Sequence, residues 1–406
     1  MIYTSINWKA RTVMVQRAFS TIGSIQERKI GLIGLGSIGT VYFTRIAAWL
    51  RSNSASIPER WSIDGLVRRE VFERAIAPIQ KTSHRNIVRF HLEQSDSSES
   101  INIDGIPVTL QEHPLDPTTN TDICRILCYD EILKEINSKV DSGMKYDVLV
   151  ICVKAYDIAS VGQRLQACDH LLHKNATIIW VYNGFTDTQL MRQGTKRHSC
   201  TNYRAIVSFG AQLKAFGHVE ACGMVRTTFF GSIEDTPLAA TPTEEDDTIK
   251  IILSMLNAAG LPSQLESHQK FKDIVWHKAI INAGINPICS ILNRSNNCLM
   301  ENKWSQKCLG LIVKECLLVA HSENALESID RKSMIRDINQ VTYNTKTNVC
   351  SMLADLRKRQ RTEIELMNGS VVAKAQIYNI PTPVNQFVLN LIQTLEADSV
   401  NRIEKV

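Results

Sequence analysis

Three polar residues recur at intervals of four in the second half of the chain: Lys278, Asn282 and Asn286. Four residues advance a helix by only about 40° beyond a full turn, so the three side chains share one face. The rest of this stretch is largely apolar, which argues against a merely solvated polar face. Two amides can hold a carbonyl and a hydroxyl while an ammonium polarises or protonates the carbonyl oxygen. The spacing therefore indicates chemistry on a carbonyl compound.

The helix that would present these residues is predicted over 274–287. We expect Pro287 to end it at a fixed point, because proline lacks the N–H that continues a helix. His277 stands beside the lysine. We interpret it as a packing or surface residue rather than as a second acid.

A glycine-rich motif near the start of the chain joins an apolar stretch at 29–33 to an amphipathic stretch at 38–51. The motif consists of Gly34, Leu35, Gly36, Ser37, Ile38 and Gly39. Strand, G-x-G-x-x-G and helix in this order predict a dinucleotide-binding turn. Gly34 permits the tight turn, Gly36 lets a pyrophosphate approach the backbone, and Gly39 lets the helix pack on the strand. The helix N-terminus adds free N–H groups.

Arg68 and Arg69 follow the next predicted strand, at 61–67. An acidic residue at this tip would accept hydrogen bonds from the 2′-hydroxyl of NAD, whereas arginine pairs with the 2′-phosphate of NADP. Asp64 is a rival, but it lies within the strand. The pattern favours NADP(H); the alternative is that both arginines lie on a solvated loop.

Two further buried strands are predicted at 146–154 and 176–182. Lys154 closes the first, and Asn183 with Gly184 follows the second. Ligands of open α/β sheets lie beyond the carboxyl ends of the strands, so we expect functional side chains at these positions. For either residue alone, an ordinary loop position is the alternative.

Composition narrows the class of protein. The chain has 406 residues, of which 44% are hydrophobic and 21% charged, as in a soluble globular protein of about two domains. No apolar run reaches the ~18 residues of a membrane span. The eleven cysteines follow no metal-binding or disulfide pattern, so we expect free thiols and no metal site.

The net charge of +5 is concentrated at the N-terminus. Residues 1–28 hold four basic residues against Glu27 alone, which leaves a nearly balanced body with no footprint for nucleic acid. The segment has the composition of a mitochondrial transit peptide, and Arg17 before Ser20 resembles a processing site. We therefore expect the protein to reside in the mitochondrial matrix. The alternatives are an untargeted, disordered extension and a cytoplasmic protein.

Five sequence blocks carry a family resemblance. They are GLGSIG at 34–39, VKAYD at 153–157, VYNG at 181–184, WHKAIINAGINP at 276–287 and SMLADLRKRQRTEIELMNG at 351–369. In these blocks the chain resembles the ketopantoate reductase (2-dehydropantoate 2-reductase) family over about 29–395. The resemblance implies an α/β fold, with an N-terminal Rossmann-type NADP-binding domain (29–265) and an all-α substrate-binding and catalytic domain (266–406). It also implies NADPH-dependent reduction of 2-dehydropantoate to pantoate, in pantothenate and coenzyme A biosynthesis.

The same resemblance assigns roles to single residues. Lys278 is similar to the family's proton donor to the nascent alkoxide, and Glu363 to the glutamate that binds and orients the substrate. The implied substrate-binding residues are Asn282, Asn286 and Ser351. The implied cofactor-binding residues outside the glycine motif are Arg68, at the 2′-phosphate, and Lys154 and Asn183, near the nicotinamide.

Two features qualify these expectations. Ser351 and Glu363 lie twelve residues apart, about 18 Å along an unbroken helix, and 357–361 contains no proline or glycine to break one. The turn at 293–299 lacks the glycine and the acidic residue usual in the family, and 84–145 is longer than bacterial members need.

Alternative functions follow from these departures. One is reduction of another branched 2-oxo acid; the other is a catalytically silent mitochondrial relative with a binding or regulatory role. A silent relative should have lost the lysine, the glutamate or the glycines, and all are present. The expected partner is a small 2-oxo acid, with no nucleic acid or membrane partner, for a monomer or a homodimer.

Overall fold

A computed structural model describes most of the chain. The described residues are 27–53, 60–68, 70–71, 73, 87–95, 103–111, 124–128, 145–167, 171–186, 188–189, 191, 200–222, 226–233 and 247–401. Nearly all of the predicted targeting segment therefore lies outside them. Within the described ranges, no helix is long and apolar enough to cross a bilayer.

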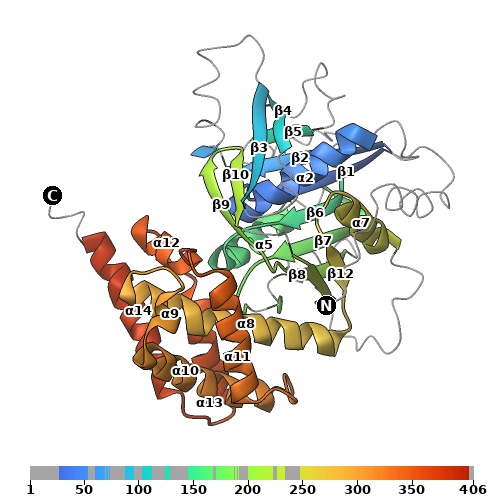
Figure 1. Cartoon of the computed structure of the whole chain (residues 1–406). Helices are drawn as coiled ribbons and strands as arrows, with labels where there is room; N and C mark the ends of the chain where they lie inside the picture. The colour runs from blue at the N-terminus through green and yellow to red at the C-terminus, as the bar shows by residue number, and fades with distance from the viewer. Residues whose placement is uncertain are drawn as a thin grey trace. The chain divides into compact units, whose positions relative to one another are not determined.

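The chain divides into two compact units (Figure 1). The first, here the sheet unit, comprises Met1–Val153, Asp157–Tyr182 and Thr188–Ser267. The second, here the helical unit, comprises Lys154–Tyr156, Asn183–Asp187 and His268–Val406. Two short segments that follow strands in the sequence thus belong to the helical unit, and we call them the strand-end segments. The predicted fold class, a Rossmann-type α/β part followed by a helical part, is confirmed.

The described strands form one twelve-stranded sheet. They are β1 (Glu27–Ile33), β2 (Arg60–Val67), β3 (Ile87–Ser95), β4 (Ile103–Gln111), β5 (Cys124–Cys128), β6 (Tyr146–Ile151), β7 (Leu172–Val181), β8 (Thr201–Ile206), β9 (Gly210–Ala215), β10 (His218–Cys222), β11 (Thr228–Ser232) and β12 (Ser263–Leu265). Their order is β12-β11-β8-β7-β6-β1-β2-β5-β4-β3-β10-β9. The strands from β8 to β4 in this order are parallel.

Two consequences follow for the predicted site. The chain passes from β1 to β2 on one side and reaches β6 on the other, so the end of β1 is the switch point where ligands of such sheets bind. The long 84–145 segment contributes β3, β4 and β5, which extend the sheet beyond β2. β6 ends at Ile151, so Lys154 lies three residues beyond the strand that was predicted to include it.

The helices divide between the units. The sheet unit contains α2 (Ser37–Asn53), α5 (Ile158–Ala167) and α7 (Asp247–Ala258). The short η2 (Ala155–Asp157) has its first two residues in the helical unit and its last in the sheet unit. The helical unit contains α8 (His268–Leu292), α9 (Cys298–Glu301), α10 (Lys303–Ser322), α11 (Arg331–Asn344), α12 (Ser351–Arg357), η5 (Ile364–Leu366), α13 (Asn368–Ile377) and α14 (Pro383–Asn401).

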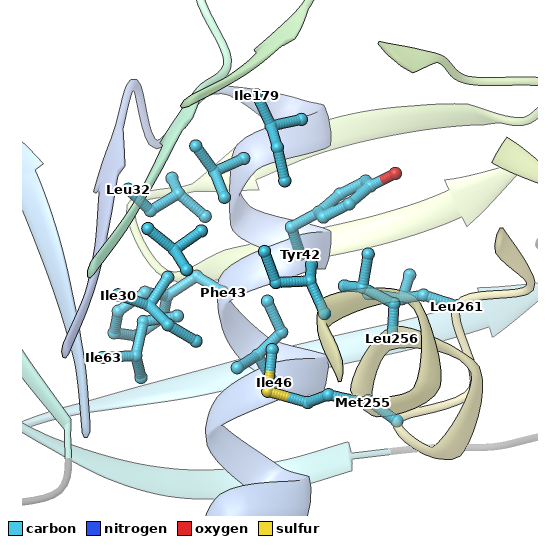
Figure 2. Packing of buried hydrophobic residues seen from close by; sticks show 14 of the residues in the cluster. Ile30, Leu32, Tyr42, Phe43, Ile46, Ile63, Ile179, Met255, Leu256 and Leu261 are labelled. Atoms are coloured by element: carbon cyan, nitrogen blue, oxygen red, sulfur yellow. The ribbon is translucent and has the colours of Figure 1, made fainter. Parts of the chain in front are cut away.

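The core of the sheet unit is built around α2 (Figure 2). Phe43 lies beside Ile30 of β1, while Tyr42 leaves the helix on another side and its hydroxyl donates to Thr228 at 2.9 Å. Ile46 packs towards α7. Each fully buried side chain of this size contributes roughly 1.5–3 kcal/mol. This packing fixes α2, and with it the glycine-rich turn at its start.

α8 continues through Pro287 to Leu292, so the expectation that the proline ends the helix is wrong. Proline cannot donate to the carbonyl of Ala283, four residues earlier. The buried side chain of Asn368 supplies the missing donor, with its Nδ2 at 3.3 Å from that carbonyl oxygen. A partner from elsewhere in the fold therefore compensates for the proline.

The segment between Ser351 and Glu363 does break, without proline or glycine. α12 ends after Arg357, and Arg359 adopts the left-handed φ of +57°. The N–H of Gln360 donates to the carbonyl of Asp355 at 2.9 Å. This is the Schellman pattern of a helix end, with an arginine in the position that usually holds glycine.

Candidate active site

The glycine-rich motif turns the chain sharply between β1 and α2. Gly34 has a φ of +90°, and a Cβ there would stand 2.3 Å from the carbonyl oxygen of Cys152. A Cβ on Gly39 would stand 2.0 Å from the carbonyl oxygen of Gly34. A side chain at either position would therefore have to displace backbone.

Gly36 differs from these two glycines, since a Cβ there would meet no atom within 4 Å. The N–H of Thr40 donates to the Gly36 carbonyl at 2.9 Å and starts the first turn of α2. The Oγ of Ser37 accepts the N–H of Leu213 at 3.1 Å, so the hydroxyl can still donate its own hydrogen. An open backbone beside a helix N-terminus fits a phosphate group.

Arg68 directly follows β2. Its side chain is about half exposed, and Nη2 lies 3.8 Å from Asp157. Asp64, by contrast, is 1% exposed inside β2 and accepts the Tyr146 hydroxyl at 3.0 Å. The tip of the strand therefore presents a guanidinium, while the rival carboxylate is engaged in the interior. Arg69 lies outside the described residues.

Lys154 lies in the first strand-end segment. Its Nζ forms a 2.6 Å ion pair with Oδ2 of Asp355, a residue of α12 that is 9% exposed. Burial alone would lower the pKa of Lys154, but the carboxylates of Glu363 and Asp355 outweigh it and raise that pKa. Lys154 is therefore a held positive charge rather than a proton donor at neutral pH.

Glu363 follows the break after α12 and is 6% exposed. Its Oε1 accepts the N–H of Ala155 at 3.0 Å. The guanidinium of Arg361 lies 5.1 Å from the ring centre of Tyr156. All three residues of the first strand-end segment thus contact the stretch that begins at Asp355.

The second strand-end segment, which begins at Asn183, is held in a similar way. A Cβ on Gly184, whose φ is +76°, would stand 2.3 Å from the carbonyl oxygen of Leu366. The N–H of Phe185 donates to that same oxygen at 2.8 Å. The Phe185 ring lies 4.6 Å from the ring of Trp276 in α8. Asn183 is half-buried, and the two residues that follow it anchor its segment to η5 and α8.

The predicted polar stripe lies along α8. Lys278 and Asn282 are half-buried, and Asn286 is 6% exposed. The Nδ2 of Asn286 lies 3.8 Å from Sδ of Met367. The backbone carbonyl of Asn286 accepts a hydrogen bond from the Cys350 thiol at 3.6 Å. Asn286 therefore links α8 to the start of α12 and to the residue after η5.

Ser351 is the exposed first residue of α12 and directly follows this contact. The helical unit thus contains seven of the predicted site residues: Lys154, Asn183, Lys278, Asn282, Asn286, Ser351 and Glu363. The glycine motif and Arg68 belong to the sheet unit. Across the described ranges, no group of three or more His, Cys, Asp or Glu side chains could hold a metal ion.

Asp355 is absent from the site residues predicted from the sequence. One signal could have indicated it: an acidic residue one helical turn after Ser351, in the same sequence block. Its partner Lys154 lies 201 positions earlier, so no local spacing joins the two.

The turn that follows α8 is closed without the glycine and the acidic residue expected there. Asn293 adopts a φ of +52° and accepts Nε and Nη2 of Arg357 at 3.1 and 3.0 Å. The N–H of Asn296 donates to Asn348 at 3.0 Å, and its side chain donates to Thr345 at 2.9 Å. Asparagines and one arginine therefore give this turn a defined conformation.

Two family models match the chain. Residues 77–235 match the model described as ketopantoate reductase PanE/ApbA, and residues 270–396 match its C-terminal model. The 2-dehydropantoate 2-reductase of Archaeoglobus fulgidus is 25% identical over 251 residues, 62% of this chain and 77% of the relative. That of Pyrococcus abyssi is 27% identical over 271 residues, 65% of this chain and 83% of the relative.

Solved structures share the fold. A ketopantoate reductase of the PanE/ApbA family from Ralstonia eutropha JMP134 superposes with a TM-score of 0.65 at 18% identity, covering 91% of this chain and 99% of that one. A ternary structure of D-mandelate dehydrogenase with NADH and anilino(oxo)acetate gives a TM-score of 0.64 at 18% identity, with the same coverage.

Proposed function

Because the chain belongs to the ketopantoate reductase family, we propose that it is an oxidoreductase that reduces 2-dehydropantoate to pantoate with NADPH. One observation carries the proposal. The α8 stripe of Lys278, Asn282 and Asn286 is joined through Asn286 to the start of α12 and to the residue after η5. A basic group and two amides are thereby held in one unit with Ser351 and Glu363.

A nicotinamide dinucleotide fits the sheet unit. The open side of Gly36 and the N-terminus of α2 suit a pyrophosphate, with Ser37 as a further donor. D-mandelate dehydrogenase, which shares the fold, binds NADH, in support of this class of cofactor. Arg68 at the tip of β2 would pair with a 2′-phosphate, whereas Asp64 is buried against Tyr146, so NADPH is favoured over NADH.

The chemistry is assigned as follows. A bound NADPH would supply a hydride to C2 of the 2-oxo acid. As the C2 oxygen gains negative charge, the Lys278 ammonium stabilises it and donates a proton to it, and solvent restores that proton. Asn282, Asn286 and Ser351 hold the polar groups of the substrate. Glu363 accepts a hydrogen bond from the substrate hydroxyl and orients it.

A second candidate keeps the reaction and changes the substrate. The D-mandelate dehydrogenase structure contains anilino(oxo)acetate, an oxoacetate derivative, which supports reduction of a 2-oxo acid other than 2-dehydropantoate. The altered turn after α8 is the feature of this chain that would accompany such a change. A catalytically silent relative with a binding role is the remaining alternative, and Lys278, Glu363 and the motif glycines speak against it.

The proposal is tested by the loss of NADPH absorbance in the presence of the purified protein. Ketopantoate is compared with 2-oxoisovalerate and with no substrate. Turnover with ketopantoate alone is expected. NADPH binding without turnover of either acid would refute the substrate assignment. If NADPH did not bind, the hypothesis of a catalytically silent relative would be favoured.

We also propose that the protein resides in the mitochondrial matrix and functions there in the supply of pantothenate and coenzyme A. The support is the basic, acid-poor composition of residues 1–28. A fluorescent fusion of the full chain should colocalise with a matrix marker, and deletion of residues 1–26, which leaves β1 complete, should disperse it. A cytoplasmic signal from the full chain would contradict the proposal.

A further inference from the structure

Lys154 has two acidic neighbours but forms its ion pair with one of them. Its Nζ lies 2.6 Å from Oδ2 of Asp355, while Glu363 acts on it as a nearby charge. The Oε1 of Glu363 accepts a backbone hydrogen instead, from the N–H of Ala155 at 3.0 Å. The two carboxylates therefore hold neighbouring but different groups of the same short segment.

The backbone of Asp355 is fixed by the end of α12. Its carbonyl oxygen accepts the N–H of Lys358 at 3.0 Å and the N–H of Gln360 at 2.9 Å. Arg359, in the left-handed conformation, closes this helix end. Asp355 is 9% exposed and its backbone is held in one conformation. Its carboxylate therefore fixes the position of the Lys154 ammonium.

We propose that Asp355 is a positioning residue of the active site, which holds the Lys154 ammonium away from Glu363 and so keeps the Glu363 carboxylate open to a substrate hydroxyl. This inference rests on the proposed function. Asp355 itself touches neither substrate nor cofactor in this assignment. It acts through Lys154.

The surroundings of Lys154 explain why its placement needs a dedicated acid. The ionisable groups near it are Asp355 of α12, Glu363 beyond the helix break and Tyr156 of its own segment, with Arg361 stacked over Tyr156. Without the Asp355 charge, Glu363 is the remaining carboxylate among them. An ion pair there would occupy the oxygen that the substrate needs, and a neutral hydroxyl would have to break that partly buried pair, at a cost in free energy, to bind.

The test is the Asp355→Asn variant of the full-length protein. The amide keeps the shape and removes the charge. We expect the KM for the 2-oxo acid to rise by about tenfold or more, the scale on which residues that orient a functional side chain act. NADPH affinity, measured by fluorescence titration, should change less. A wild-type KM for the 2-oxo acid in this variant would overturn the proposal.

The split between KM and kcat separates positioning from a merely structural role. Asp355→Asn should raise the KM for the 2-oxo acid and leave kcat largely unchanged, because the Lys278 ammonium is untouched. Asp355→Glu, which keeps the charge, should restore the KM. Glu365→Gln, an exposed neutralisation in the same stretch, is the matched control and should leave the KM unchanged.

Coupling to Lys154 and a direct structural readout complete the design. In a Lys154→Met background, Asp355→Asn should have little further effect; an equally large effect there would overturn the proposal. A crystal structure of Asp355→Asn should show the Lys154 ammonium paired with Glu363. An ammonium in its wild-type position would also overturn the proposal. The crystal structure does not depend on turnover. If the wild-type protein reduced no 2-oxo acid, the proposed function would be refuted, and the position of the Lys154 ammonium in Asp355→Asn would still decide the positioning inference.

Should Asp355→Asn fail to fold, Asp355→Glu decides the question. It retains the charge and moves it by one methylene. The Lys154 ammonium should stay paired with residue 355 in a crystal structure of this variant, with a near wild-type KM for the 2-oxo acid. An ammonium paired with Glu363 at a wild-type KM would overturn the proposal.

Discussion

The glycine-rich turn of the sheet unit and the stretch from Asp355 to Leu366 in the helical unit do comparable work by different means. In the turn, six consecutive residues create the shape: Gly39 packs on the Gly34 carbonyl within the motif, Gly34 passes close to the Cys152 carbonyl, and Gly36 leaves its backbone open. In the second stretch, side chains and carbonyls meet partners from the two strand-end segments, far away in the sequence. A site for a phosphate can thus be encoded locally, whereas this candidate catalytic site is assembled by tertiary contacts.

The largest effect is expected at the centre of the assembled site. Replacing Lys278 with alanine should lower kcat by ~10²-fold or more, the typical contribution of a positioned acid. His277→Ala is the matched control, because this half-exposed side chain contacts Asp337 at 3.0 Å and has no assigned role. Equal losses of kcat in both variants would show that the helix, and not the lysine, was disturbed.

The local site can be tested with two glycines of one motif. Gly39→Ala places a methyl group against the Gly34 carbonyl and should destabilise the fold by about 1–3 kcal/mol or more, measured as unfolding in urea. Gly36→Ala meets open space, so its stability should equal that of the wild type. Its NADPH affinity should fall by about tenfold, or ~1.4 kcal/mol. Unaltered NADPH binding by Gly36→Ala would show that the pyrophosphate does not bind at this turn.

The compensation at Pro287 provides the next effect. Asn368→Ala leaves the Ala283 carbonyl without its side-chain donor and should cost about 1–3 kcal/mol of unfolding free energy. Asn390→Ala, at an exposed position of α14, is the control and should change stability by less than about 0.5 kcal/mol. A wild-type denaturation midpoint for Asn368→Ala would mean that α8 tolerates the open carbonyl.

The smallest effect concerns cofactor choice. Arg68→Ala should reduce the preference for NADPH over NADH by about tenfold, since the guanidinium is half exposed and its pairing with a phosphate is partly screened. The ratio of kcat/KM values with the two cofactors measures it. Arg51→Ala, on the exposed end of α2, should leave the ratio unaltered. An unchanged ratio in Arg68→Ala would assign the 2′-phosphate to another residue.

Prediction from the sequence succeeded where a feature depends on neighbouring residues. The strands at β1, β2, β6 and β7 and the helix α2 follow from apolar periodicity and the glycine motif. It failed at Pro287, because the partner that compensates for the proline, Asn368, lies 85 positions away. It also gave no sign of the break at Arg359, since an arginine carries no intrinsic preference for the left-handed region.

The candidate site shows the same division. Spacing alone puts Lys278, Asn282 and Asn286 on one helix face, because the period of a helix is independent of its surroundings. Which carboxylate Lys154 contacts, and that Glu363 accepts a hydrogen bond from Ala155, were decided only by the tertiary structure. Ion pairs and side-chain hydrogen bonds depend on the final positions of both partners, and no local pattern in the chain encodes those positions.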